Sequence, residues 1–330
     1  MDSLHFEIKT LHLIEPFRIA HGTSATRQVL RVSNGELFTE APFVPYYGED
    51  PAQTLAVLHQ AVLPAQLPRT ASLALNLLRH DIIGHQTKQP LAAYAQSKLG
   101  APVHPAPPGC RSFSIPDDLD AFAEKVRLIA QQFSVLKLKL GSGDLGLDIA
   151  TVSVARQAAP EAQLLLDVNG GWDLAEAPLM IEKLAEYSPA LIEQPIHHRL
   201  GVEGWEELRA LLPGNAVPIF ADESVQNADD VLALADFVDG VNIKLLKCGS
   251  LDAAVGMIAA AKEHSLQILL GCMIETSLGT TAAAHLAPWA DWIDLDGHFY
   301  VTNDDFTGIE YDAQGRLVMP ARPGIGAIPR

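Results

Sequence analysis

The sequence predicts an α/β fold, a (β/α)8 barrel of the TIM type that follows a smaller α+β domain. Two observations predict it. Eight short apolar segments recur after residue 108, and a helical pattern separates each from the next, as in repeated βα units. The segments are SFSI, VLKLKL, QLLLDV, ALIEQP, PIFADE, GVNIKLL, QILLGCM and WIDLDG. Their unbroken apolar character is typical of parallel strands that are covered on both faces.

An open, doubly wound sheet is the competing fold. It requires a glycine-rich phosphate-binding turn directly after its first strand. The run GSGDLG follows the second segment instead, and it lacks the full dinucleotide-binding pattern. The barrel is therefore favoured.

The residues before the barrel change character twice. Residues 1–50 alternate polar and apolar side chains around Asn34-Gly35, which predicts antiparallel strands joined by a hairpin turn. Residues 51–99 carry apolar side chains at helical spacing. The proline-rich stretch 101–110 then predicts a linker, after which a second domain begins.

Composition limits the classes of partner. A formal net charge of −17 repels phosphate backbones, so we expect neither nucleic acid nor an anionic membrane as a partner. No run approaches the roughly 18 apolar residues that cross a bilayer, and the first residues lack a secretory signal pattern. Cys110, Cys248 and Cys272 are widely spaced, which is typical of a reducing cytoplasm rather than of disulfides or a zinc site.

Acidic residues end three consecutive predicted strands. Enzymes with this fold carry their chemistry at the C-terminal ends of the strands. Asp167, Glu193 and Asp222 stand at these ends in strands three, four and five. Because carboxylate oxygens are the ligands that Mg²⁺ prefers, the three residues predict a magnesium site.

Lysines end the second and sixth predicted strands. Lys137 and Lys139 end the second strand, and Lys244 ends the sixth. Strands two and six are four apart in a ring of eight, so Lys139 and Lys244 should face each other across the barrel mouth. One lysine can then remove a proton from a substrate carbon while the other returns a proton to the opposite face, which inverts the stereocentre. The divalent ion would stabilise the enediolate formed on the substrate carboxylate.

Several of these motifs occur together in one known family. KLKL, LDVNGGW, LIEQP, FADES, NIKLLKCGS and the IDLDG segment resemble the muconate-lactonising subgroup of the enolase superfamily, and within it the dipeptide epimerases. The resemblance covers nearly the whole chain. It implies a modified (β/α)8 TIM-type barrel over residues 109–300, an N-terminal α+β capping domain over residues 1–108, and a C-terminal segment, residues 301–330, that returns to the capping domain.

The resemblance also implies an activity. This is a Mg²⁺-dependent isomerase that epimerises a dipeptide, L-Ala-D/L-Glu or a related one, by two-base 1,1-proton transfer. The implied roles are Mg²⁺ ligation by Asp167, Glu193 and Asp222, acid/base catalysis by Lys139 and Lys244 with assistance from Lys137, substrate binding by Asp294, Asp296 and Met273, and support by Asn169 and Asn242. The D-x-D pair would hold the substrate's α-ammonium, which the cycloisomerases and succinylbenzoate synthases of the family have no need to bind.

One position departs from the family pattern. Family members that act on Ala-Glu carry an arginine in the loop after the first strand, where this chain has Gly22. Arg18, His21 and Arg27 are the candidate substitutes. The second residue of the dipeptide therefore stays open between Glu, Ala and a hydrophobic residue.

Four alternatives stay open. Within the superfamily these are an N-acylamino acid racemase and an o-succinylbenzoate synthase. A Schiff-base aldolase would also use a lysine on the sixth strand, here Lys244. A barrel that binds a ligand without catalysis is the fourth. Glu275 and His285 are interpreted as supporting or packing residues, and the sequence leaves homo-oligomerisation open.

Overall fold

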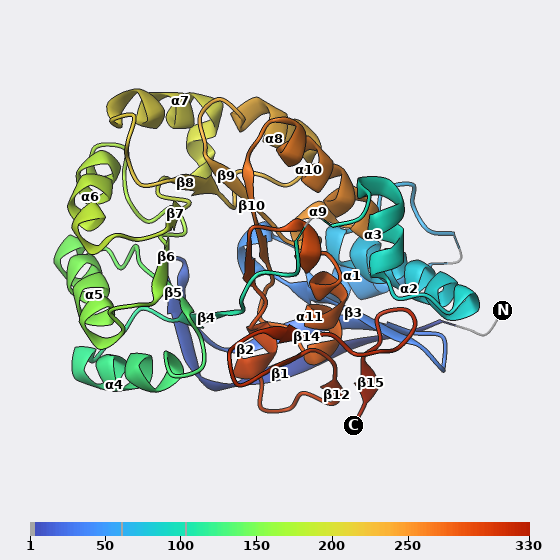
Figure 1. The fold of residues 1–330 in the computed structure, drawn as a ribbon. Coiled ribbons are helices and arrows are strands. Elements are labelled where there is room, and N and C mark those ends of the chain that lie inside the picture. The colour runs from blue at the N-terminus through green and yellow to red at the C-terminus, as the bar shows by residue number, and fades with distance from the viewer. Residues whose placement is uncertain (1–3, 61, 103) are drawn as a thin grey trace.

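The protein is described by a computed structural model that covers residues 4–60, 62–102 and 104–330 (Figure 1). Its first part is an antiparallel sheet in the order β1-β2-β3. The strands are β1 (His5–Ile19), β2 (Gly22–Ser33) and β3 (Phe38–Phe43). At the predicted hairpin, Asn34 Oδ1 accepts hydrogen bonds from the backbone N–H groups of Glu36 and Leu37, which confirms the turn. The sheet is followed by η1 (Pro45–Tyr47), α1 (Pro51–Leu58), α2 (Arg69–Thr87) and α3 (Ala92–Leu99).

The second part confirms the predicted barrel. All eight apolar segments form strands, and they pair in parallel in sequence order from the first to the eighth. The strands are β4 (Cys110–Phe113), β5 (Val135–Lys139), β6 (Gln163–Asp167), β7 (Leu191–Glu193), β8 (Ile219–Ala221), β9 (Gly240–Ile243), β10 (Gln267–Gly271) and β11 (Trp292–Asp294).

Helices follow the strands and lie outside them (Figure 1). They are α4 (Leu119–Ile129), α5 (Leu145–Ala158), α6 (Glu176–Leu184), η2 (Ala185–Tyr187), η3 (His198–Leu200), α7 (Gly201–Leu211), α8 (Ala228–Leu234), α9 (Leu245–Cys248), α10 (Leu251–Glu263), α11 (Ser277–Ala284), η4 (Ala287–Trp289) and η5 (Gly297–Tyr300). Several begin at a residue whose side chain caps the helix. Asp118, Asp144 and Ser250 each accept a backbone N–H in the first turn of α4, α5 and α10.

The barrel interior changes from apolar to charged along its axis. Because side chains alternate across a strand, Val135, Lys137 and Lys139 of β5 share one face. Val135 packs in a buried apolar cluster with residues of the neighbouring strands, including Leu165 and Leu191. Two residues further along β5, β6, β7 and β8 the cluster gives way to charged side chains, namely Lys137, Asp167, Glu193 and Asp222. The apolar layer thus forms the floor beneath the charged one.

Side chains complete the barrel between its first and last strands. The Ser112 hydroxyl on β4 donates to Asp294 Oδ1 on β11 at 2.9 Å. The backbone N–H of Ser112 donates to Asp296 Oδ2 at 2.7 Å. The two acids that the sequence assigns to substrate therefore also join β11 to β4.

After the barrel the chain returns to the first sheet at Asp305. It forms two small antiparallel pairs, β12 (Phe306–Thr307) with β15 (Ile328–Pro329) and β13 (Glu310–Tyr311) with β14 (Leu317–Val318). Asp305 pairs with Arg31 of β2 at 2.7 Å and also with Lys9 of β1. The division of the chain at residues 108 and 300 stays a prediction.

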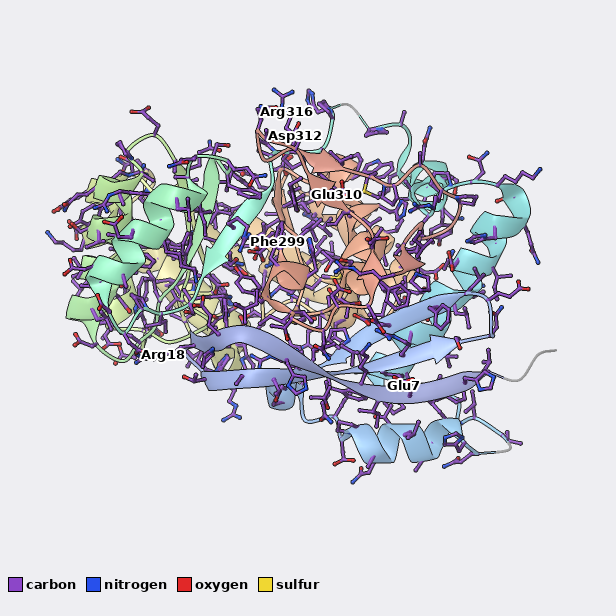
Figure 2. The ribbon with its side chains drawn as sticks, turned by 90° about the horizontal axis from the view of Figure 1, so that it is seen from below. Glu7, Arg18, Phe299, Glu310, Asp312 and Arg316 are labelled. Atoms are coloured by element: carbon purple, nitrogen blue, oxygen red, sulfur yellow. The ribbon has the colours of Figure 1, made fainter. Side chains whose placement is uncertain are left out.

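Figure 2 shows the β1–β3 sheet along one side of the barrel. The loop between β1 and β2 and the end of β3 reach the barrel mouth, where Phe17, His21 and Phe43 line one cavity together with Lys139 and Lys244. Within the described residues, no helix combines the length and the apolar character that spanning a membrane requires.

Candidate active site

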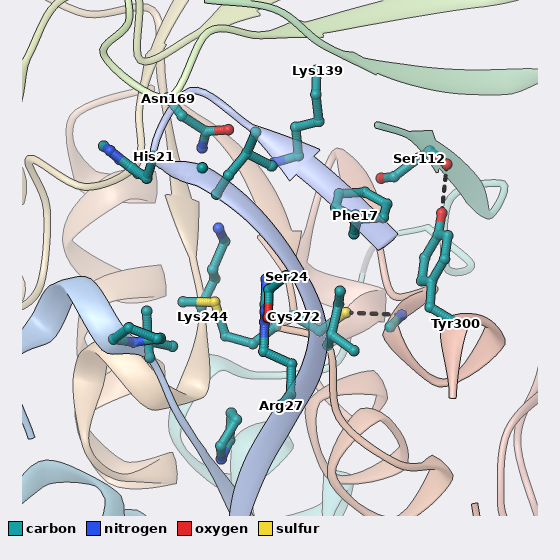
Figure 3. A pocket seen from close by; sticks show the side chains of 18 of the residues that line it. Phe17, His21, Ser24, Arg27, Ser112, Lys139, Asn169, Lys244, Cys272 and Tyr300 are labelled. Atoms are coloured by element: carbon teal, nitrogen blue, oxygen red, sulfur yellow. Dashed lines mark hydrogen bonds between the residues drawn. The ribbon is translucent and has the colours of Figure 1, made fainter. Parts of the chain in front are cut away.

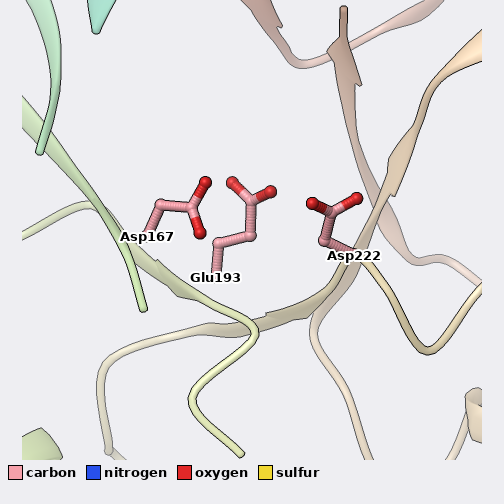
Figure 4. Close-up of side chains that lie close together, drawn as sticks. All are labelled: Asp167, Glu193 and Asp222. Carbon is pink, nitrogen blue, oxygen red and sulfur yellow. The ribbon is translucent and has the colours of Figure 1, made fainter. Parts of the chain in front are cut away.

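Three carboxylates meet at the ends of adjacent strands. Asp167, Glu193 and Asp222 follow one another around the barrel mouth from β6 to β8 (Figure 4). One carboxylate oxygen of each lies within 4.8 Å of the others, and each residue is at most 1% exposed. The structure thus brings together the three residues that the sequence selected as metal ligands.

Lys137 lies among acids at the centre of the barrel. Its side chain is fully buried, and its Nζ lies 3.0 Å from Asp167 Oδ2, 2.7 Å from Glu193 Oε2 and 2.8 Å from Asp294 Oδ2. Burial alone would lower the pKa of Lys137, but the facing carboxylates, Asp167 first among them, raise it well above its usual value. Lys137 is therefore a fixed cation whose charge these carboxylates offset. Its predicted assistance to Lys139 is not tested by these contacts.

Lys139 and Lys244 border the same cavity. Lys139 Nζ lies 2.5 Å from Asp167 Oδ2, and Lys244 Nζ lies 2.7 Å from Asp222 Oδ2. The two lysines thus contact the two outer acids of the triad. Figure 3 shows them entering the pocket from different sides. This agrees with their positions at the end of β5 and directly after β9, strands that are four apart in the sheet order.

The three acids differ in their affinity for protons. Burial and the nearby Asp167 raise the pKa of Glu193 to about 8. Burial also opposes ionisation of Asp167, but Lys137 and Lys139 outweigh it and lower the pKa to about 2. In the same way Lys244 and Lys247 hold the pKa of Asp222 well below its usual value.

Of the three acids, Glu193 is therefore the one whose negative charge the surroundings disfavour. A proton on Glu193 can relieve this unfavourable charge, and so can a cation beside it. Three oxygen donors from carboxylates, close together and buried, form a hard ligand set that suits Mg²⁺. The residues present fit such an ion.

Asn242 and Asn169 lie where the sequence predicted supporting residues. Asn242 Nδ2 donates to Glu193 Oε1 at 2.6 Å, which orients the middle acid of the triad. Asn169 Nδ2 donates to Glu223 Oε1 at 3.0 Å, and its backbone N–H donates to Asp167 Oδ1 at 3.1 Å. Asn169 adopts a positive φ of 49°, a left-handed conformation that asparagine tolerates better than most residues.

The predicted substrate acids lie in the cavity wall but differ from each other. Asp294 is tied to Lys137 and to the Ser112 hydroxyl, and although burial opposes it, Lys137 lowers the pKa of this carboxyl. Burial and the neighbouring Asp294 raise the pKa of Asp296 to about 6. Met273 also lines the cavity, which has a volume of about 370 Å³.

The structure distinguishes the three candidates, Arg18, His21 and Arg27, that could replace the arginine found in family members at the position of Gly22. His21 and Arg27 line the cavity beside Gly22. Arg18 lies elsewhere, and its Nη1 contacts Asp117 Oδ1 at 2.9 Å in an exposed ion pair. Apolar side chains, Phe43 and others from the same sheet, form much of the remaining wall.

Sequence reasoning missed several buried residues of the site. Lys247 Nζ donates to Asp222 Oδ1, and Glu223 accepts from Asn169. The Tyr300 hydroxyl lies 2.8 Å from Asp296 Oδ2 and donates to the backbone carbonyl of Ser112 (Figure 3). Only Lys247 had a visible signal, a second lysine in KLLK one helical turn after Lys244.

Comparison with known proteins places the chain in a family. Residues 120–330 match the model of the family described as "Enolase C-terminal domain-like". The chain belongs to the enolase superfamily. This membership confirms the resemblance inferred from the motifs, and it sets the chain apart from the Schiff-base aldolases.

Curated relatives in the superfamily include dipeptide epimerases. An L-Ala-D/L-amino acid epimerase from Pedosphaera parvula is 41% identical over 215 residues, which cover 64% of this chain and 60% of the relative. The chain thus spans less than two thirds of that relative's length. An L-Ala-D/L-Glu epimerase from Bacillus subtilis is 30% identical over 348 residues, covering 96% of this chain and 93% of the relative.

A solved structure agrees with the whole fold. The dipeptide epimerase from Enterococcus faecalis V583, complexed with Mg and L-Leu-L-Tyr, superposes with a TM-score of 0.85 at 26% identity, and 99% of each chain is covered. The barrel and the sheet that covers it are therefore shared with this member of the enolase superfamily.

Proposed function

We propose that the chain is a Mg²⁺-dependent dipeptide epimerase that inverts an α-carbon by proton transfer between two lysines. One observation carries the proposal. Lys139 and Lys244 border one cavity from strands four apart, and each contacts a different outer acid of the same triad. A substrate α-carbon between the two amines would have a base on each face.

In the forward direction Lys139 removes the α-proton. As the C–H bond breaks, its electron pair delocalises into the adjacent carboxylate of the substrate, and the proton is held on Nζ. Lys244 then donates a proton to the opposite face, where the returning electron pair forms the new C–H bond. For the other stereoisomer the two lysines exchange roles, so the reaction needs no redox partner.

Mg²⁺ is part of the proposal because the donor set fits it. Asp167, Glu193 and Asp222 would hold the ion. When bound, it would supply the positive charge that makes the proton of a weakly acidic α-carbon removable. Lys137, which contacts both Asp167 and Glu193, would hold these two acids in position. Asn242 would also hold Glu193 through its hydrogen bond to Oε1.

The dipeptide's termini would be recognised by different parts of the cavity. We propose that Asp296, together with Asp294, binds the α-ammonium group, because these acids are the anionic part of the wall away from the triad. The second side chain would meet the β1–β3 sheet. Arg27 and His21 there suit an acidic side chain, while Phe43 and Ile274 suit an apolar one.

Deuterium exchange tests the function. The purified chain with Mg²⁺ would be incubated in D₂O with dipeptides that include L-Ala-L-Glu, L-Ala-L-Ala and L-Leu-L-Tyr. We expect deuterium at one α-carbon and formation of the epimer, both abolished by a chelator and restored by Mg²⁺. Exchange on N-acylamino acids alone would favour an N-acylamino acid racemase, and dehydration to succinylbenzoate would favour an o-succinylbenzoate synthase. If no dipeptide in the library showed exchange, a protein that binds a ligand without catalysis would be favoured.

The three cysteines support a location in a reducing compartment. Cys110, Cys248 and Cys272 are free thiols, and Cys272 lines the cavity. Such thiols persist in the cytoplasm, where we place the enzyme.

A further inference from the structure

Lys247 is a buried cation that the proposed reaction does not use. It belongs to α9, the short helix that begins directly after Lys244, and it is 2% exposed. A buried ammonium is costly unless its three N–H groups find acceptors. The position of these acceptors shows what the residue can do.

All three acceptors of Lys247 lie at the triad. Its Nζ donates to Asp222 Oδ1 at 2.5 Å, to the Asp222 backbone carbonyl at 2.5 Å and to the Asn242 backbone carbonyl at 2.7 Å. These groups occupy the ends of β8 and β9. The three donors are thus committed to the protein, and Lys247 is not among the residues that line the cavity.

The two oxygens of Asp222 are divided between two lysines. Lys247 holds Oδ1, and Lys244 contacts Oδ2 from the cavity side. A cation bound by the triad would compete with Lys244 for Oδ2. Lys247 does not face this competition, because two of its three hydrogen bonds go to backbone carbonyls that the strands hold fixed.

We infer that Lys247 is a positioning residue that fixes Asp222 with Oδ2 turned toward the metal site. This inference rests on the proposed function. Lys247 holds Oδ1 beside the backbone carbonyls of Asp222 and Asn242, and it balances the charge of Asp222 when Lys244 acts on the substrate. Residues that orient metal ligands in this way change metal affinity by about 10- to 100-fold when they are replaced.

Mg²⁺ affinity, measured by titration calorimetry on the full chain, tests the inference directly. We expect Lys247→Met to raise the Kd for Mg²⁺ by about 10- to 100-fold. Lys262→Met, on the exposed face of α10, is the matched control and should leave the Kd unchanged. Lys244→Met should not weaken Mg²⁺ binding, because it removes a competitor for Oδ2.

Exchange activity at different Mg²⁺ concentrations distinguishes a positioning role of Lys247 from a catalytic one. Raising Mg²⁺ should restore exchange activity in Lys247→Met but not in Lys244→Met. If Lys247→Met does not fold, Lys247→Gln, which keeps two amide donors without the charge, takes its place. A Kd in the folded variant equal to or below that of the wild type would overturn the inference. Failure of the wild type to exchange any dipeptide would remove the proposed function, while the comparison of Kd values would still decide the role of Lys247.

Discussion

Lys137 of β5 and Asp294 of β11 form an ion pair at 2.8 Å across the barrel interior. The pair joins the lysine beneath the triad to one of the two acids assigned to the substrate. Asp294 therefore has one oxygen committed to the protein and a second that accepts from Ser112. The contacts of Asp296 with Ser112, Tyr300 and Arg111 are all made by Oδ2, so we expect its Oδ1 to be the oxygen that meets a substrate cation.

Asp296→Asn should mainly weaken recognition of the substrate's amine. A hydrogen bond to a charged group contributes about 1.5 to 3 kcal/mol, so we expect KM for free-amine dipeptides to rise about 10- to 100-fold with a smaller change in kcat. An N-acetylated dipeptide serves as the control substrate and should show no such penalty. Asp294→Asn should instead lower kcat, because it releases Lys137. Equal effects of Asp296→Asn on both substrates would show that this acid does not meet the amine.

Replacing either of the two lysines proposed as acid and base should remove epimerisation but not all exchange. We expect Lys139→Met and Lys244→Met each to lower the rate of epimerisation about 10²- to 10⁴-fold, the usual contribution of a positioned acid or base. Each variant should still exchange the α-proton of the one stereoisomer that faces its remaining lysine. Proton NMR in D₂O with separate stereoisomers measures this, and exchange of both by one variant would exclude a two-base mechanism.

Arg27→Met should identify the second residue of the dipeptide. Arg27 lines the cavity, whereas Arg18 pairs with Asp117 outside it. If Arg27 meets an acidic side chain, its loss should lower kcat/KM for L-Ala-L-Glu about tenfold or more relative to L-Ala-L-Leu. Arg18→Met is the matched control and should leave this ratio unchanged. An unchanged ratio in Arg27→Met as well would exclude Arg27 as the specificity residue.

Glu275 should make the protein less stable as the pH rises. Burial, with a smaller effect of Glu40, raises the pKa of this carboxyl from 4.5 to about 8. Between these values the unfolded chain loses the proton while the folded chain keeps it, so stability falls as the pH rises. From pH 5 to pH 8 the contribution is roughly 3 to 4 kcal/mol.

Glu275→Gln removes this titration while keeping the shape of the side chain. We expect the variant to lose less stability than the wild type between pH 5 and pH 8 in urea unfolding with a chelator present. The two proteins should be most similar near pH 5. Parallel stability curves across this range would show that Glu275 does not hold a proton in the folded state.

Much of the barrel could be predicted because each βα unit repeats the same local pattern. The apolar segments mark strands that are buried on both faces, and charged residues at their ends can then be placed by strand number alone. This is why the sequence predicts the grouping of Asp167, Glu193 and Asp222, and the two lysines across from each other. Their positions follow from strand order, which a sequence states directly.

What the sequence could not predict depends on contacts between distant segments. Strand order does not show that Asp294 binds Lys137, or that Ser112 bridges to both acids of the D-x-D pair. Nor does it distinguish Arg18 from Arg27, which lie on the paired strands β1 and β2 but point to different surroundings. Lys247 carried a signal, but a lysine one turn after another is most often a solvated residue.

The junction at Ser112 limits how this protein can be redesigned. Asp294 and Asp296, which are proposed to bind the dipeptide, also connect β11 to β4. They do so by accepting hydrogen bonds from the hydroxyl and the backbone N–H of Ser112. A variant made to accept a molecule with no amine would have to give up one or both acids, and with them part of the link that keeps the first and last strands together. A change of substrate specificity of this kind therefore requires new contacts between β4 and β11 as well as new residues in the cavity wall.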